Sequence, residues 1–186
     1  MARICVFCGS RSGDLSEFNR AAENLGSHLV RCGHTLVYGG GRTGMMGILA
    51  DRVLQNGGKV IGVIPQHLAR PELMHECVPD MRITIDMHAR KAVMHSLADA
   101  YIALPGGYGT LEELFEAVTW SQLALHSRPV KVLNINGLFN GLVDMLDQMT
   151  NHGFLSVECR QHLQVYSTTE ELLPWVESLP SDFHMQ

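Results

Sequence analysis

Residues 103–113 read ALPGGYGTLEE, in which an apolar run is followed by a glycine-rich loop and then by an acidic, helix-forming stretch. This order indicates a buried strand that ends in a pliable loop and continues at once as a helix. Glycine permits close approach of other groups to the backbone, and the first turn of a helix carries unpaired N–H groups. The junction therefore predicts an anion-binding loop at the carboxyl end of a strand.

The same alternation of apolar runs and helical stretches continues along the chain, and we expect a Rossmann-like α/β fold. Apolar strands joined by helices pair in parallel in a doubly wound, mostly parallel sheet, with ligands beyond the carboxyl ends of the strands. We expect one domain over 1–180 and a frayed tail at 181–186. The expected strands are 3–7, 34–38, 59–65, 81–85, 100–105, 130–135 and 163–167. The expected helices are 15–32, a helix that opens within 39–47 and ends at about 56, 86–100 with Asp86 as its cap, 110–125, 139–152 and 169–177. The segment 66–76 is expected to be irregular.

Composition excludes several classes of protein. The net charge is −5 and the 14 Lys and Arg residues are scattered, so no basic stripe for nucleic acid is expected. Every apolar run is shorter than a membrane span, and we expect a cytoplasmic protein without a membrane partner. Cys5 and Cys8 should lie on opposite faces of a strand as reduced thiols, and His88 and His95 are two helical turns apart, roughly 10 Å. We therefore expect neither a metal site nor a cofactor.

Three glycine-bearing loops follow predicted strands, at 8–13, 39–44 and 105–109. The loop 39–44 formally matches the dinucleotide fingerprint G-x-G-x-x-G, but the next strand ends in Pro65 and Gln66 without the acidic residue that binds an adenosine ribose. A nucleotide-triphosphate P-loop does not occur in the sequence. The loops therefore favour a bound phosphate over NAD or triphosphate hydrolysis, while tight turns alone remain the alternative.

Two helices carry anomalous charges. On 110–125, Glu113 shares a strip with Ala117, Trp120 and Ala124, which we expect a partner subunit to cover. On 86–100, Arg90 and Lys91 interrupt an apolar face near the helix start, which indicates a nearby anion or carboxylate. The alternative is that their long apolar stems run along the core while the charged ends reach solvent. The stripe of 110–125 expected to face the sheet consists of Leu111, Leu114, Phe115, Val118 and Gln122, and the face shared by Arg90 and Lys91 includes Met87, Met94, Leu97 and Ala98.

The stretches VFCGS, YGGGRTGMMG, GVIP, DMHARK and LPGGYGTLEE, in this order, resemble the LONELY GUY (LOG) family over nearly the whole chain. The resemblance implies a homodimeric phosphoribohydrolase that cleaves the N-glycosidic bond of purine (cytokinin or adenosine) riboside 5′-monophosphates to free base and ribose 5-phosphate. It implies Arg90 and Glu113 as the catalytic pair. The substrate-binding residues that it implies are Ser10, Gly40, Gly41, Met87, Arg90, Lys91, Gly106, Gly107, Gly109 and Thr110.

Two other functions use the same loops. A nucleotide-binding sensor or scaffold of this fold would need the phosphate contacts but not Glu113 with Arg90. The lysine decarboxylase label sometimes given to this family would need a lysine that binds pyridoxal phosphate. Lys59 and Lys131 begin predicted strands, at the opposite end of the sheet from the loops, which leaves Lys91 without an evident partner for the cofactor ring.

Overall fold

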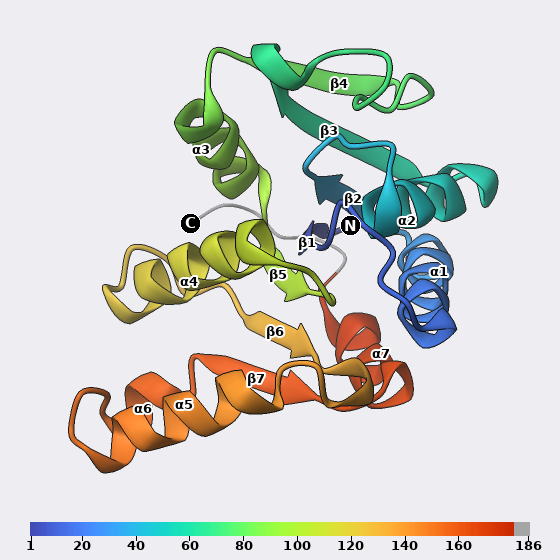
Figure 1. Cartoon of the computed structure of the whole chain (residues 1–186). Helices are drawn as coiled ribbons and strands as arrows, with labels where there is room; N and C mark the ends of the chain where they lie inside the picture. The colour runs from blue at the N-terminus through green and yellow to red at the C-terminus, as the bar shows by residue number, and fades with distance from the viewer. Residues whose placement is uncertain (181–186) are drawn as a thin grey trace.

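A computed structural model describes residues 1–180, which form one α/β domain around a seven-stranded parallel sheet (Figure 1). The strand order is β4-β3-β2-β1-β5-β6-β7, and every pair of neighbours is parallel. The predicted Rossmann-like fold is therefore confirmed. The strands are β1 (Arg3–Phe7), β2 (Thr35–Tyr38), β3 (Lys59–Pro65), β4 (Asp80–Thr84), β5 (Ala100–Ala103), β6 (Val130–Leu133) and β7 (Leu163–Tyr166).

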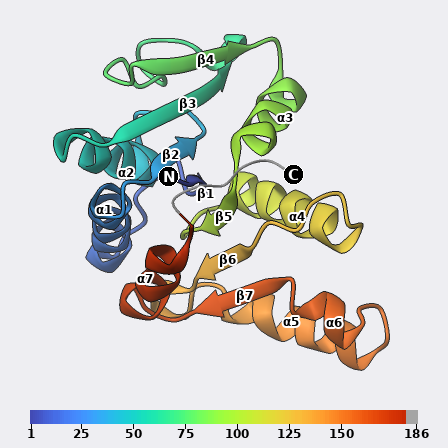
Figure 2. The ribbon, with the colours of Figure 1, turned by 180° about the vertical axis from the view of Figure 1, so that it is seen from behind.

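Helices cover both faces of the sheet, as the views from the two sides show (Figures 1 and 2). One apolar core lies between the sheet and α1, α2 and α7, and a second lies between the sheet and α3, α4 and α5. The helices are α1 (Ser16–Arg31), α2 (Gly44–Gln55), α3 (Met87–Leu97), α4 (Tyr108–Gln122), α5 (Asn140–Asn151), the short α6 (Val157–Arg160) and α7 (Thr169–Ser178), with single 3₁₀ turns η1 (Gln66–Leu68) and η2 (Ile135–Gly137).

Several local predictions are confirmed. Asp86 caps α3, because its side chain accepts a hydrogen bond of 2.8 Å from the backbone N–H of Ala89. Cys5 and Cys8 are free thiols that belong to different cores, on opposite faces of the sheet. The segment 66–76 has a single 3₁₀ turn and otherwise irregular structure. The predicted tail at 181–186 lies outside the described residues.

Helix α4 differs from its prediction in three respects. It begins two residues earlier than Thr110 and ends at Gln122, and Ala124 lies beyond it with a left-handed φ of 56°. Ala117 and Glu113 are buried, whereas a strip open to a partner was expected. The reason is that α3 and α4 lie side by side on one face of the sheet, where Ala117 packs in the second core and Glu113 pairs with Arg90 of α3. The four apolar residues of the predicted stripe do pack in the second core, but Gln122 is exposed.

Two further observations complete the fold. The sequence reasoning missed α6, which is a single turn capped by the side chain of Ser156. Among residues 1–180, none of the helices combines the length and the apolar character needed to cross a bilayer.

Candidate active site

The glycine loops meet at the point where the sheet reverses its order of connection. β1 and β5 are adjacent, yet β1 leads to α1 on one face and β5 leads to α4 on the other. The backbone N–H of Gly9 donates a hydrogen bond of 3.0 Å to the carbonyl of Pro105, which joins the loops that follow these two strands. Crevices at such switch points are the usual ligand sites of open parallel sheets.

The third glycine loop joins the first through its backbone. The Thr43 hydroxyl donates to the Ser10 carbonyl at 3.2 Å, and the N–H of Met46 donates to the Gly9 carbonyl at 3.3 Å. Gly40 and Gly41 face another neighbour: the Gly40 carbonyl accepts the N–H of His75 at 3.0 Å, and Gly41 forms an isolated bridge with Met74. The loop 39–44 is therefore held between the first loop and the segment near residue 75.

A cavity of about 900 Å³ opens beside these loops, on the side of α1 and α2. Ser10, Gly106 and Gly107 line it, together with apolar side chains that include Phe18 and Leu138. Arg90 and Glu113 are not among its lining residues. The structure thus divides the predicted site residues between this cavity and the helix pair α3–α4. A smaller cavity of about 520 Å³ lies at the opposite end of the strands and contains none of the glycine loops.

Three helices start at the glycine loops without a capping side chain. The residues at the caps of α1, α2 and α4 are Leu15, Thr43 and Gly107, and none of their side chains accepts a backbone N–H bond at the helix start. In contrast, side chains cap α3, α6 and α7. The first hydrogen bond of α4 is that from Leu111 to Gly107, so the N–H groups of residues 108–110 have no acceptor within the helix. These groups can bind an anion.

The predicted catalytic pair is brought together at 2.8 Å between Arg90 Nη2 and Glu113 Oε1. Both side chains are buried, with exposed fractions of 11% and 9%. Arg90 Nε has no hydrogen-bond partner within residues 1–180, and Nη1 contacts only the Met87 sulfur, at 3.6 Å. One edge of the guanidinium is therefore satisfied by Glu113, while Nε is a buried donor without a partner among the described residues.

Gly39, which the sequence reasoning did not single out, sets the place of Arg90. A Cβ atom at this position would lie 2.3 Å from Arg90 Nη2, so only glycine leaves room for the guanidinium. The triple glycine 39–41 was the available signal, but the sequence does not reveal which of the three faces a side chain.

Burial raises the pKa of Glu113 to about 7, although the positive charge of Arg90 lowers it. The negative charge of Glu112 raises this pKa further, and the positive charge of Lys91 lowers it. Near neutral pH the carboxyl group therefore exchanges readily between its two protonation states. A carboxylate of this kind suits proton transfer.

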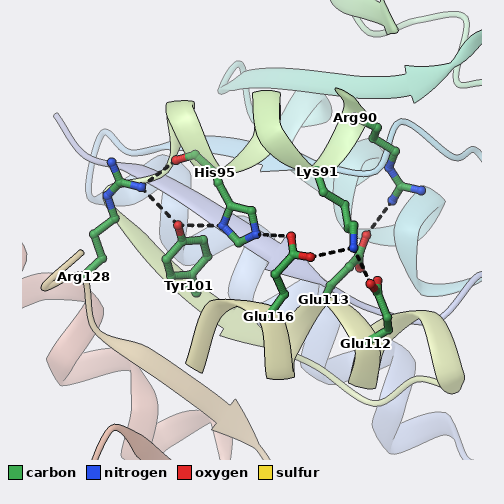
Figure 3. Close-up of polar contacts among 8 residues, drawn as sticks. All are labelled: Arg90, Lys91, His95, Tyr101, Glu112, Glu113, Glu116 and Arg128. Atoms are coloured by element: carbon green, nitrogen blue, oxygen red, sulfur yellow. Dashed lines mark hydrogen bonds and ion pairs between the residues drawn. The ribbon is translucent and has the colours of Figure 1, made fainter. Parts of the chain in front are cut away.

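Lys91 is also buried, and carboxylates explain its placement as predicted. Its ammonium contacts Glu112 and, at 2.7 Å, Glu116, both of which belong to α4 (Figure 3). Burial lowers the pKa of Lys91, but hydrogen bonds to the two carboxylates outweigh this effect and raise it overall. Lys91 is thus a protonated cation that links α3 to α4.

A chain of hydrogen bonds continues from Glu116 to the start of β6 (Figure 3). Arg128 donates to the Tyr101 hydroxyl at 3.2 Å, the hydroxyl lies 2.9 Å from His95 Nδ1, and His95 Nε2 lies 3.0 Å from Glu116. Because arginine can only donate and a carboxylate can only accept, Tyr101 must donate to Nδ1 and Nε2–H to Glu116. Burial lowers the pKa of His95, which agrees with this neutral form.

We predict that Gly106→Ala disrupts the contact between the loops whereas Gly107→Ala does not. A Cβ at Gly106 would lie 2.0 Å from Thr110 Oγ1 and 2.9 Å from the backbone nitrogen of Gly9, but at Gly107 it would meet nothing within 4 Å. Thermal or urea unfolding should show a loss of about 1–3 kcal/mol for Gly106→Ala, the usual cost of overpacking. Equal stability of the two variants would contradict the tight contact.

The chain is similar to known proteins over most of its length. A family model described as possible lysine decarboxylase matches residues 46–176. The cytokinin riboside 5′-monophosphate phosphoribohydrolase LOG4 of Arabidopsis thaliana is 48% identical over 175 residues, which are 94% of this chain and 81% of that protein. The cytokinin riboside 5′-monophosphate phosphoribohydrolase LOG of Oryza sativa subsp. japonica is 43% identical over 183 residues, 98% of this chain and 76% of that protein.

Solved structures show the same fold at lower identity. The molybdenum cofactor binding protein of Rippkaea orientalis has a TM-score of 0.72 and 21% identity, covering 95% of this chain and 96% of that one. The molybdenum cofactor carrier protein of Chlamydomonas reinhardtii has a TM-score of 0.70 and 19% identity, with coverage of 95% and 96%. These likenesses concern the fold alone. Because the family model spans most of the chain and these relatives exceed 40% identity along nearly all of it, the chain belongs to the LONELY GUY family.

Proposed function

We propose that the protein hydrolyses the N-glycosidic bond of purine riboside 5′-monophosphates, of the cytokinin or adenosine type, and releases the free base and ribose 5-phosphate. The observation that carries this proposal is the buried pair of Arg90 and Glu113 at the edge where the glycine loops meet. The names of the relatives in Arabidopsis and rice support the same reaction and substrate class.

In this proposal the uncapped helix starts bind the 5′-phosphate. Ser10, Gly106 and Gly107 border the cavity, and Gly109 and Thr110 belong to the first turn of α4, whose free N–H groups favour an anion. Gly40 and Gly41 lie in the adjoining loop and would contact the nucleotide, and Met87, beside Arg90, would lie near the base. Binding of the phosphate would hold C1′ in place for reaction.

Glu113 would act on the water that attacks C1′. As the water oxygen bonds to C1′, the bond to the base nitrogen breaks and its electron pair leaves with the base. The water proton passes to Glu113 and then to the departing base, so the carboxylate is regenerated. The sugar becomes positively charged as this bond breaks, and a nearby carboxylate stabilises that charge. Arg90 has donors left over from its bond to Glu113 with which to orient the substrate or polarise the base.

The alternative of lysine decarboxylation needs an uncharged lysine that attacks pyridoxal phosphate. The chain has three lysines, Lys59, Lys91 and Lys131. Lys91 is held as a cation by two carboxylates, and Lys59 lies at the first residue of β3, at the edge of the sheet away from the glycine loops. Lys131 lies in β6 and contacts Gln164. Burial lowers the pKa of Lys131, which favours its uncharged form, but its amino group lies over the rings of Tyr166 and Trp175 rather than at the glycine loops.

Replacement of Glu113 by Gln is expected to reduce base release from AMP by roughly a thousandfold or more, because the amide cannot accept the water proton. Nucleotide binding, measured by calorimetry, should change little. The matched control is Glu170→Gln, which makes the same substitution at an exposed residue in the first turn of α7. If Glu113→Gln retained full activity, Glu113 would not be catalytic. If the wild-type protein bound AMP but released no adenine, a non-catalytic nucleotide sensor would be the better assignment.

The activity is also expected to depend on pH through Glu113. Only the ionised carboxylate can accept a proton, and its pKa of about 7 lies above the ordinary value of 4.5. The ionised fraction therefore falls as the pH drops through 7, so kcat/KM should decrease about tenfold per pH unit below roughly pH 6. A pH profile with AMP as substrate measures this acid limb. An acid limb near pH 4.5, the ordinary pKa of a glutamate, would contradict the prediction that burial raises the pKa of Glu113.

We further propose that the protein is a cytoplasmic homodimer, with the end of α4 in the interface. Leu123 and Leu125 are 62% and 67% exposed, next to the partly buried Trp120. Apolar side chains grouped in this way favour a covering surface. The free thiols of all five cysteines support a reducing compartment.

The double variant Leu123→Glu with Leu125→Glu should therefore be monomeric in light scattering coupled to gel filtration, because charge would be buried without a partner. Ile83→Glu serves as the control, since Ile83 is 59% exposed in the edge strand β4, whereas α4 packs against β1, β5 and β6. A monomeric wild-type protein would refute the dimer, and a dimeric double variant would exclude this surface.

A further inference from the structure

Lys91 occupies a position that is unfavourable for a cation unless it has a specific task. It is 8% exposed and lies in the second turn of α3, close to the positive end of the helix dipole. Burial of an ammonium costs several kcal/mol unless carboxylates compensate it. Glu112 and Glu116 provide this compensation, so the three charged groups form one unit between α3 and α4.

The two carboxylates that bind Lys91 flank Glu113 along α4. Glu112 immediately precedes Glu113, and Glu116 follows it by three residues, close to one helical turn. Lys91 in turn immediately follows Arg90, the partner of Glu113. The lysine thereby links α3 to α4 beside the contact between Arg90 and Glu113 (Figure 3).

The charges around Glu113 are closely balanced. Arg90 and Lys91 from α3 favour its ionised form, whereas Glu112 and Glu116 on its own helix oppose it. The buried thiols of Cys5 and Cys8, in β1 and just after it, complete the titratable surroundings and stay neutral because burial raises the pKa of both. Without Lys91, two carboxylates would remain beside Glu113 against the single charge of Arg90.

We propose that Lys91 is a positioning residue of the hydrolytic reaction, which neutralises Glu112 and Glu116 and so keeps Glu113 ionised and paired with Arg90. This inference rests on the proposed function of Glu113 as the base. It differs from a role for Lys91 in binding the nucleotide phosphate, because its ammonium is already engaged by two carboxylates.

The sign of the effect follows from these charges. Loss of the Lys91 cation removes an attraction and exposes Glu113 to two like charges, so its pKa must rise. Loss of the Glu116 charge removes a repulsion, so the pKa of Glu113 must fall. A residue that only holds the helices together would lower the activity at every pH without moving the acid limb.

The test compares the pH profiles of kcat/KM for AMP in the wild-type protein and in four variants: Lys91→Met, Lys91→Arg, Glu116→Gln and Lys91→Met combined with Glu116→Gln. The acid limb should move up by about one pH unit in Lys91→Met, the lower end of the effect of an adjacent charge. It should move down in Glu116→Gln, return toward the wild-type position in the double variant and stay in place in Lys91→Arg.

Titration of the Glu113 carboxyl by carbon-13 NMR, assigned by its loss in Glu113→Gln, provides a readout that does not depend on catalysis. If wild-type protein proves inactive, the proposed hydrolysis fails while this titration still tests the charge balance. If Lys91→Met does not fold, the downward shift in Glu116→Gln decides. The proposal is overturned if the pKa of Glu113 is the same in the folded variants as in the wild-type protein. It is also overturned if Lys91→Met raises the KM for AMP without moving the acid limb of the pH profile, because that result would assign Lys91 to binding of the phosphate.

Discussion

The requirement that buried charges be paired governs the arrangement of α3 against α4. Two cations at the start of α3 are largely buried between the sheet and α4, and each pairs with carboxylates on α4. Breaking one such pair would leave an uncompensated charge in the interior, which costs more than the loss of an ordinary contact. The helices are therefore held in one register, and Glu113 lies near the edge of the sheet where the glycine loops meet.

The loops themselves depend on a different constraint, which is the topology of the sheet. Because β1 and β5 are neighbours but lead to opposite faces, the loops that follow them come into contact at the carboxyl edge. Each loop opens a helix whose first N–H groups have no capping side chain. The site thus combines backbone donors, which favour an anion, with a side-chain pair that suits acid–base chemistry.

Much of this could be read from the sequence. The period of the apolar residues gave the order of strands and helices, since a strand buried on both faces is apolar throughout. The loop 105–109 indicated where backbone donors gather, and the placement of Arg90 and Lys91 on an apolar face predicted a nearby anion or carboxylate, which α4 provides. Local signals also located caps, as at Asp86, because a capping side chain acts within three residues of its own position.

The parts that could not be predicted depend on contacts between distant segments. The helical wheel of α4 shows which side chains share a face, but not that Ala117 is buried in the core or that Glu113 is buried beside Arg90 of α3. The fit of Gly39 against Arg90 joins residues about 50 positions apart. The order of donors from Arg128 through Tyr101 to Glu116 likewise emerges only when three elements are packed together.

That donor order leaves the protons of the chain no freedom of choice. Many hydrogen-bonded rings and files of hydroxyl groups can reverse direction at little energetic cost, because each member both gives and takes a proton. Here a guanidinium terminates one end and a carboxylate the other, so reversal would place two lone pairs or two hydrogens face to face. The network of Arg128, Tyr101, His95 and Glu116 therefore has a single orientation of its hydrogen-bond dipoles.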